Sequence, residues 1–175
     1  LVQETDVTSR PAGQRSIVLI STRDPLFPHL DTRSNIVFAL RAQGQSHAEA
    51  DAGAGRMMSL LGLDGLGNLS PQDLNPEQTF RAMLARALVT APTILLLDNP
   101  YSDLDIHAGR RIASLLSKLS RARNLSVLQS VTRKEDALRA GGQIALFNEE
   151  ELLQCGTAAE LYDRPSDVGV ATHFG

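Results

Sequence analysis

Short apolar runs alternate with longer amphipathic segments along the chain, and this pattern predicts an α/β fold. Runs rich in Ile, Val and Leu occur at 16–21, 93–98 and 125–131. Each has the length and composition of a buried strand. The segments between them carry apolar residues at helical spacing. Strands that alternate with helices in this way favour a mainly parallel sheet.

The expected helices have recognisable start and stop residues. Asn75, Asp105 and Thr157 are suitable N-caps, Pro76 suits a first helical position, and Glu77 suits a first turn. Helices are expected at 32–44, 46–65, 77–90, 105–123, 133–141 and 157–164. Two strand-like runs near the end predict a closing β-hairpin over 143–156. We expect one domain over 1–175, with an inserted helical subdomain at 30–90.

Composition and charge exclude several classes of protein. The net charge is −3 over 175 residues, with no basic stripe, which argues against nucleic-acid binding. The longest apolar runs are far too short to span a bilayer. The single cysteine, Cys155, cannot form an internal disulfide, and the four histidines show no metal-ligand spacing with it. These features favour a cytoplasmic protein.

Three long segments together resemble one protein family. They read DPLFPHLDTRSNIVFAL at 24–40, LNPEQTFRAMLARALVTAPTILLLDNPYSDLD at 74–105 and IALFNEEELLQCGTAAELYDRP at 144–165. In this order they resemble the loop before the helical subdomain, the signature-to-D-loop region and the C-terminal hairpin of ATP-binding-cassette (ABC) transporter ATP-binding subunits. Within this family, the chain most resembles the subunits of importers for glycine betaine, polyamines, sugars or iron. The resemblance covers about 6–175.

The resemblance implies a P-loop NTPase (ABC ATPase) type of sheet, with ATP and Mg²⁺ as cofactors. It also implies a transporter membrane subunit or a homologous ATP-binding subunit as partner. Members of the family commonly form homodimers, so a homodimer is implied as well. Such a protein would lie at the inner face of the cell membrane. In the family the phosphate loop precedes the position equivalent to Leu1, so the N-terminal part of the fold is expected to be missing here. The pattern G-x-x-x-x-G-K-[ST] does not occur in this sequence.

The family's catalytic positions can be matched residue by residue. Asp98 falls on the Walker B aspartate, which supports Mg²⁺ through water, although a strand-end carboxylate that caps a local turn is the alternative. Asn99 falls where the family has the glutamate that polarises the attacking water. An amide there removes the general base. Thr22 falls on the glutamine that contacts Mg²⁺, and Thr132 falls on the switch histidine.

The family signature Leu-Ser-Gly-Gly-Gln falls on 74–78, where it binds the γ-phosphate of ATP held by the partner subunit. The residues here are Leu74, Asn75, Pro76, Glu77 and Gln78. Proline has no N–H to offer, and a glutamate should repel a phosphate.

Further residues have both a functional and a structural interpretation. Asp105 matches the D-loop aspartate but is equally a good helix cap. Residues 27–30, FPHL, match a region that faces the membrane subunit in the family, with loop packing as the alternative. Met57 and Met58 are expected to be packing residues. Arg110 and Arg111 are expected to form a solvated helix face.

Three functions remain open on these grounds. The first is a degenerate, non-hydrolysing ATP-binding subunit that serves as structural or regulatory partner in a solute-import complex. The second is an active transporter ATPase whose phosphate-loop segment is absent from this sequence. The third is a binding module unrelated to transport on a recycled ABC fold. The joint change of base, histidine, glutamine and signature favours the first.

Overall fold

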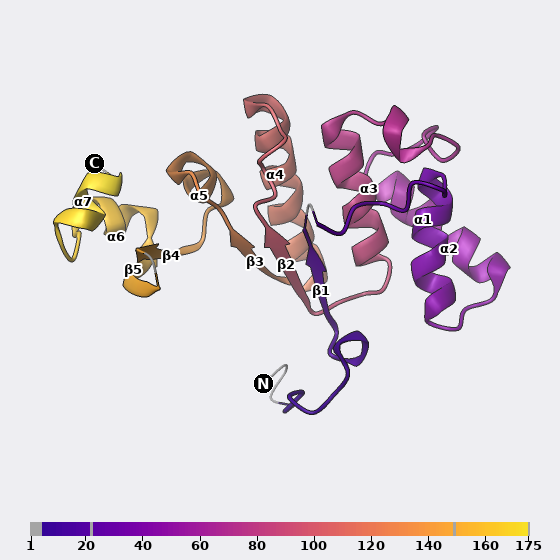
Figure 1. Ribbon diagram of the computed structural model, residues 1–175, viewed down its shortest axis with the longest axis horizontal. Coiled ribbons are helices and arrows are strands. Elements are labelled where there is room, and N and C mark those ends of the chain that lie inside the picture. Colours follow the sequence, from indigo (N-terminus) through magenta and orange to yellow (C-terminus); the bar gives the residue numbers. More distant parts are fainter. Residues whose placement is uncertain (1–4, 22, 149, 175) are drawn as a thin grey trace.

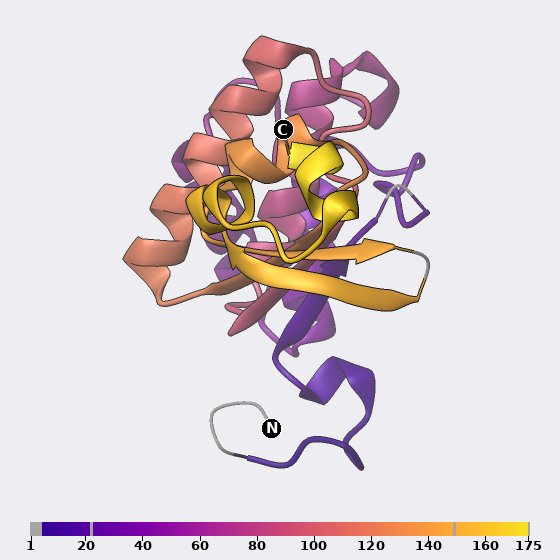
Figure 2. The same ribbon diagram turned by 90° about the vertical axis from the view of Figure 1, so that its left-hand side faces the viewer.

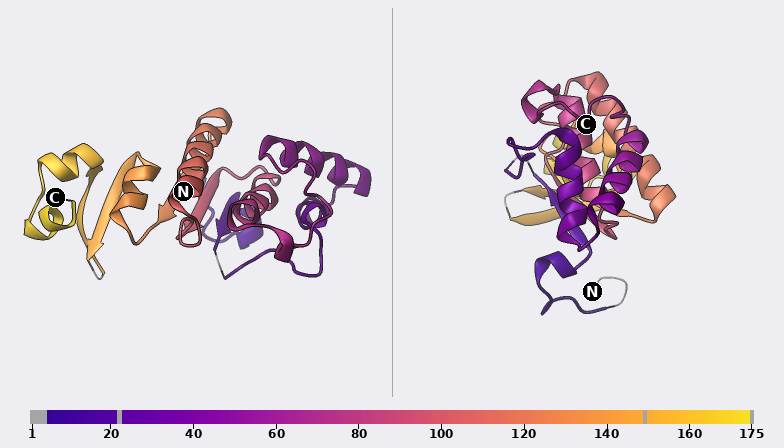
Figure 3. Two further views of the ribbon diagram at one scale, coloured as in Figure 1. Left: turned by 90° about the horizontal axis from the view of Figure 1, so that it is seen from above. Right: turned by 90° about the vertical axis from the view of Figure 1, so that its right-hand side faces the viewer.

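The structure is a computed structural model that describes residues 5–21, 23–148 and 150–174, and its elements lie in a row along one long axis (Figures 1 and 3). The elements in chain order are η1 (Ala12–Gln14), β1 (Ile17–Ile20), α1 (Thr32–Ala42), α2 (His47–Leu60), η2 (Pro71–Asp73), α3 (Pro76–Leu88), β2 (Ile94–Asp98), α4 (Ile106–Arg123), β3 (Ser126–Ser130), α5 (Lys134–Ala140), β4 (Gln143–Asn148), β5 (Glu151–Thr157), α6 (Ala158–Asp163) and α7 (Val168–Phe174). Helices α1 to α3 lie at one end, and α6 and α7 lie at the other.

The central sheet confirms the predicted α/β class. Its strand order is β1-β2-β3, and both pairings are parallel. Leu95 and Leu97 of β2 point to the face that α3 and α4 cover, and both are buried. Successive side chains point to opposite faces of a strand. Accordingly, Leu19 and Leu128 lie on the other face and are 52% and 67% exposed.

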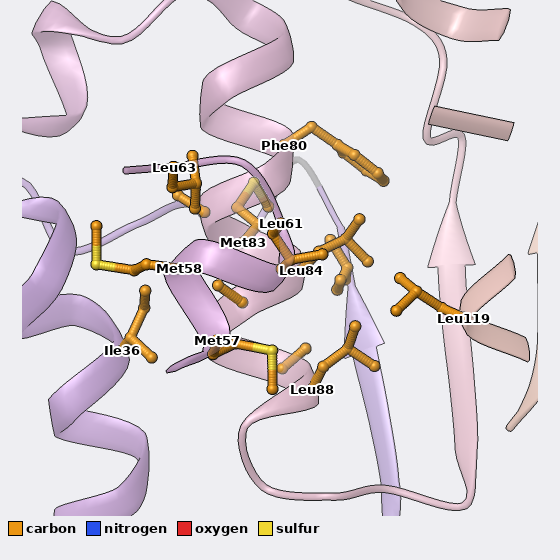
Figure 4. Packing of buried hydrophobic residues seen from close by; sticks show 14 of the residues in the cluster. Ile36, Met57, Met58, Leu61, Leu63, Phe80, Met83, Leu84, Leu88 and Leu119 are labelled. Atoms are coloured by element: carbon orange, nitrogen blue, oxygen red, sulfur yellow. The ribbon is translucent and has the colours of Figure 1, made fainter. Parts of the chain in front are cut away.

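The main core lies between the sheet and helices α1 to α4. Ile36 of α1, Met57 of α2, and Leu84 and Leu88 of α3 belong to one buried cluster, part of which Figure 4 shows. All four are buried, and Met58 is only 4% exposed. The expectation that the two methionines are packing residues is therefore confirmed.

Helix α2 is shorter than the sequence pattern predicts. It begins with a capping box formed by Ser46 and Glu49, as the pattern suggests, but it ends at Leu60 rather than at 65. Gly62 adopts a φ of +67°, a left-handed conformation that costs glycine little and ends the helix. The turn that follows buries Leu61 and Leu63 fully, which the continued helix would not do.

The C-terminal part has a small core of its own. Strands β4 and β5 form the predicted antiparallel hairpin, and α6 and α7 pack beside it (Figure 2). Ile144, Leu161, Val170 and Phe174 are its buried residues. Helix α7 was not predicted. No helix in the described ranges is both long and apolar enough to cross a membrane.

Candidate functional site

Asp98 ends β2 and is bonded to both neighbouring strand ends. Its carboxylate accepts a hydrogen bond from Ser130 Oγ at 2.8 Å and another from Ser21 Oγ at 3.4 Å. Ser21 follows β1 and Ser130 ends β3, and parallel strands bring their carboxyl ends to one edge of the sheet. The described contacts of the carboxylate are thus with adjacent strands, not with its own turn.

Asn99 begins the turn that leaves this edge. Its φ is +48°, in the left-handed region that asparagine enters more readily than most residues. Its backbone N–H donates to the Ser130 carbonyl at 3.0 Å and to Ser130 Oγ at 3.3 Å. The turn closes when Ser102 N–H donates to the Asn99 carbonyl. Asn99 therefore starts this turn through its backbone, in a conformation that asparagine adopts more readily than most residues.

The signature positions form the start of α3. Asn75 Oδ1 accepts from Gln78 N–H, and Gln78 Oε1 accepts from Asn75 N–H, both at 2.9 Å. This capping box confirms Asn75 as N-cap. Pro76 occupies the first helical position and has no N–H. Most of the donors that a helix start usually offers to an anion are therefore engaged or absent at 75–78.

Glu77 lies between two arginines. Its carboxylate accepts from Arg81 Nη2 at 2.8 Å and from Arg111 Nη2 at 2.5 Å, and only 17% of its side chain is exposed. The hydrogen bonds from Arg111 and then Arg81 hold the pKa of Glu77 below its usual range. Arg111 belongs to α4, so this pair joins α3 to α4. Arg110 and Arg111 lie on an exposed face of α4, as predicted, and Arg111 in addition forms this ion pair.

Asp105 caps α4. Its Oδ1 accepts from His107 N–H at 2.7 Å and from Ala108 N–H at 2.8 Å. The bond from Ala108 is the main reason that the pKa of Asp105 is lowered. The structural interpretation of Asp105 is confirmed, while a D-loop role stays a prediction.

The candidate residues are spread over two cavities. Asp98 and Thr132 line one of about 870 Å³ between the open sheet face and the hairpin. Asp98 also lines a second cavity of about 310 Å³, together with Asn99, Leu74 and Pro76. The other predicted site residues line neither cavity; they are Asn75, Glu77, Gln78 and Asp105. Thr22 lies outside the described residues.

The loop after β2 is anchored by residues that the sequence did not single out. Tyr101 is fully buried, and its hydroxyl donates to Gln129 Oε1 at 3.0 Å. Burial raises the pKa of Tyr101 to about 12, so the phenol stays protonated. Arg139 lies over the ring and also pairs with buried Asp136. These contacts tie the loop to β3 and α5.

The segment FPHL is held rigidly against α1. Buried Asn35 accepts from Phe27 N–H at 2.7 Å and donates to the carbonyls of Phe27 and Leu30 at 3.1 Å. The Phe27 ring meets Phe38 edge-on at a centroid distance of 4.9 Å, and the Arg86 guanidinium lies 5.2 Å from its centre. Loop packing is therefore confirmed, and Phe38 remains 51% exposed beside it.

The structure adds Ser21, Ser130 and Arg111 to the predicted site residues. Ser21 and Ser130 close two of the predicted strands, so the rule that parallel strands end at one edge was the signal for them. Arg111 had no such signal, because Glu77 lies 34 residues away in sequence. Within the described part of the chain, no group of three or more His, Cys, Asp or Glu side chains is placed to hold a metal ion.

Comparison with known proteins agrees with this architecture. The chain is 32% identical over its whole length to an Fe(3+) ions import ATP-binding protein, FbpC, of Rhizobium etli, and covers 50% of it. It is 33% identical to the FbpC of Agrobacterium fabrum, again over the whole chain and 50% of that protein. It is 32% identical to a spermidine/putrescine import ATP-binding protein, PotA, of Roseobacter denitrificans, over 97% of the chain and 47% of that protein.

The chain therefore spans about half the length of the curated relatives it matches. The family described as ABC transporter matches residues 1–102, which is more than half of the 175 residues. Within that match lie β1, the start of α3 and the Asp98 strand end. On this evidence the chain belongs to the ABC transporter family.

Proposed function

We propose that this chain is a degenerate ATP-binding subunit of an ABC importer, which does not hydrolyse ATP and acts as a structural or regulatory partner in a solute-import complex. The relatives are named as import ATP-binding proteins, for Fe(3+) ions and for spermidine/putrescine. Those names support the importer class. They do not select one solute, since the two relatives differ in theirs.

The observation that carries the proposal is Asn99 in its left-handed turn beside Asp98. In the family this position holds the carboxylate that acts on the attacking water, whereas the amide of Asn99 accepts no proton. The loss of a general base typically costs about 10²–10⁴-fold in rate. The backbone bonds from Asn99 to Ser130 support a structural use of this position instead.

The start of α3 supports the same proposal. A phosphate at this helix start would meet the carboxylate of Glu77, which Arg81 and Arg111 keep in place. It would also find Pro76 without an N–H and the Gln78 N–H already bonded. These residues do not fit a phosphate group, so we propose that ATP does not join two copies of this subunit through 74–78. Binding of ATP and Mg²⁺ elsewhere, with Asp98 near the metal, is implied by family membership alone.

A membrane subunit is the proposed partner. Phe27, Phe38 and Arg86 form an aromatic surface whose backbone is fixed by Asn35, and exposed aromatic side chains on a rigid support are common anchors of protein interfaces. A cytoplasmic subunit bound in this way would reach the inner face of the membrane through its partner.

The test is steady-state phosphate release by the purified full-length protein with Mg²⁺ and ATP, beside a fluorescent-nucleotide binding assay. We expect no turnover above a no-enzyme control. The matched variants Asn99→Glu and Asn99→Gln separate the missing base from the altered turn. Magnesium-dependent turnover that Asp98→Asn abolishes would refute the proposal and favour an active ATPase. Failure to associate with any transporter membrane subunit would refute the partner role.

A further inference from the structure

An arginine of α5 reaches past α4 to the loop that follows β2. Helix α5 lies next to α4 (Figure 1). The guanidinium carbon of Arg139 lies 5.7 Å from the centre of the Tyr101 ring, which is within the range of a cation–π contact. Only 16% of the Arg139 side chain is exposed, and Tyr101 is fully buried. This largely buried cation therefore joins a helix to a loop that lies far from it in sequence.

The path of Arg139 depends on a glycine near the start of α4. Gly109 is buried, and a Cβ atom at this position would lie 2.9 Å from Arg139 Nη1 and 3.4 Å from its Cζ. The first of these distances is too short for a real side chain, so alanine here would displace the guanidinium. Glycine is otherwise unfavourable inside a helix. The absence of a side chain at Gly109 thus forms a notch in α4 that the end of Arg139 occupies.

Asp136 holds Arg139 in place and has a second partner. The Asp136 side chain is buried, and its Oδ1 accepts from Arg139 Nη1 while its Oδ2 accepts from Arg133 Nε at 2.8 Å. Arg133 is 56% exposed and, within the described part of the chain, forms no hydrogen bond, ion pair or cation–π contact with the loop 99–104. If Arg139 withdraws, the carboxylate keeps Arg133. The contact with the loop can therefore open without leaving a buried charge unpaired.

The loop 99–104 is weakly held by its own backbone. Ser102 N–H donates to the Asn99 carbonyl at 3.3 Å, and Leu104 N–H donates to the Tyr101 carbonyl at 3.2 Å. Both distances are at or beyond the upper end of the usual range. The middle of the loop is held instead by Tyr101, through its hydroxyl on β3 and its ring against α5. Loss of the contact with α5 should therefore loosen the loop.

We propose that Arg139 acts as a latch. When it occupies the notch at Gly109 it holds the loop 99–104 to α5, and when it withdraws the loop opens while Asp136 stays paired with Arg133. A movement of α5 is thereby transmitted to the loop. Helix α5 also forms part of the wall of the cavity of about 870 Å³, so a displacement of that wall would reach the loop. The latch does not depend on whether the protein hydrolyses ATP.

The test is amide hydrogen exchange of the full-length protein, followed by NMR at Ser102 and Leu104 and compared with the amides of β2. Arg139→Ala should raise exchange at the two loop amides about five- to ten-fold relative to β2, because it removes a desolvated cation–π contact. Arg133→Ala is the matched control, since it removes the other partner of Asp136 and should leave this ratio unchanged. An equal effect of the two variants, no effect of Arg139→Ala, or loop amides that already exchange at the unprotected rate would overturn the proposal.

A second pair of variants tests the notch. Gly109→Ala fills it, so this variant should raise exchange in the loop by a similar factor and lower the urea midpoint, although alanine favours the helix. In a protein that already carries Arg139→Ala, the same change should leave the loop as it is and raise the midpoint, because only the helix preference of alanine remains. If Gly109→Ala acts alike in both backgrounds, the notch and the arginine are independent and the latch is refuted.

Discussion

Replacing Glu77 by glutamine tests whether the α3–α4 ion pairs contribute to stability. The change keeps the size of the side chain and removes its charge from the two arginines. Arg81 is 21% exposed and also donates to the Leu61 carbonyl at 2.8 Å, so it stays anchored without Glu77. Arg111 is 54% exposed, so water can replace much of its bond.

These exposures set the expected magnitude. The Arg81 pair, at i and i+4 on one helix, is worth about 0.5 kcal/mol. The Arg111 pair joins two helices at short distance, but its guanidinium is largely solvated, so it adds little to this. We therefore expect Glu77→Gln to lower the free energy of unfolding by about 0.5 kcal/mol or slightly more at pH 7.

The pH dependence distinguishes charge from packing. The pKa of Glu77 is lowered in the folded protein, so its contribution is complete above the ordinary glutamate pKa of about 4.3. It is lost as the pH falls through the lower pKa of the folded state. Urea unfolding of both proteins from pH 7 downward should show the difference shrinking below about pH 4.3. Glu135→Gln is the matched control. An undiminished difference in acid, or none at pH 7, would refute this reasoning.

Three further substitutions have expected outcomes. Asp105→Ala removes two hydrogen bonds to the start of α4 and should lower the free energy of unfolding in urea by about 1 kcal/mol. Asp105→Ser, which can still cap the helix, should retain most of that stability. An equal loss in both variants would exclude the cap. Asn99→Ala places alanine at a φ of +48° and should lower the free energy of unfolding by about 1 kcal/mol. Asn99→Gly should not lower it, because glycine adopts this conformation readily. The same loss in both variants would show that the amide side chain, not the backbone conformation, stabilises the turn. Asn35→Ala leaves the Leu30 carbonyl without its amide donor and the Phe27 N–H without its acceptor, while the Phe27 and Asp31 carbonyls keep backbone donors. It should cost about 1–3 kcal/mol in urea unfolding, with faster proteolysis of that loop, and an unchanged midpoint would contradict the anchoring role.

Local signals in the sequence were sufficient for most elements and for the helix starts. In β2, Leu95 and Leu97 are buried under the covering helices, whereas Leu96 lies on the open face of the sheet and Asp98 is exposed. Asn75 and Asp105 were predictable as caps, because a cap bonds to N–H groups two or three residues away. Such interactions depend on neighbours within one helical turn. The left-handed turns that shorten α2 were less visible, since glycine is also tolerated inside helices.

Tertiary structure decided what surrounds each candidate residue. The hydroxyls that hold Asp98 come from 77 and 32 residues away in sequence, and the arginine on Glu77 comes from 34 residues away. Pairing of that kind depends on strand register and helix packing, which no local pattern specifies. The cavity of about 310 Å³ beside Asp98 and Asn99 likewise forms only because the start of α3 packs against the ends of β1 and β2. Residue type and order alone were enough to predict the α/β class and the family, and they place an amide rather than a carboxylate at position 99. Only the folded chain decided which charges are balanced and which are left open, because long-range contacts set the distances between them.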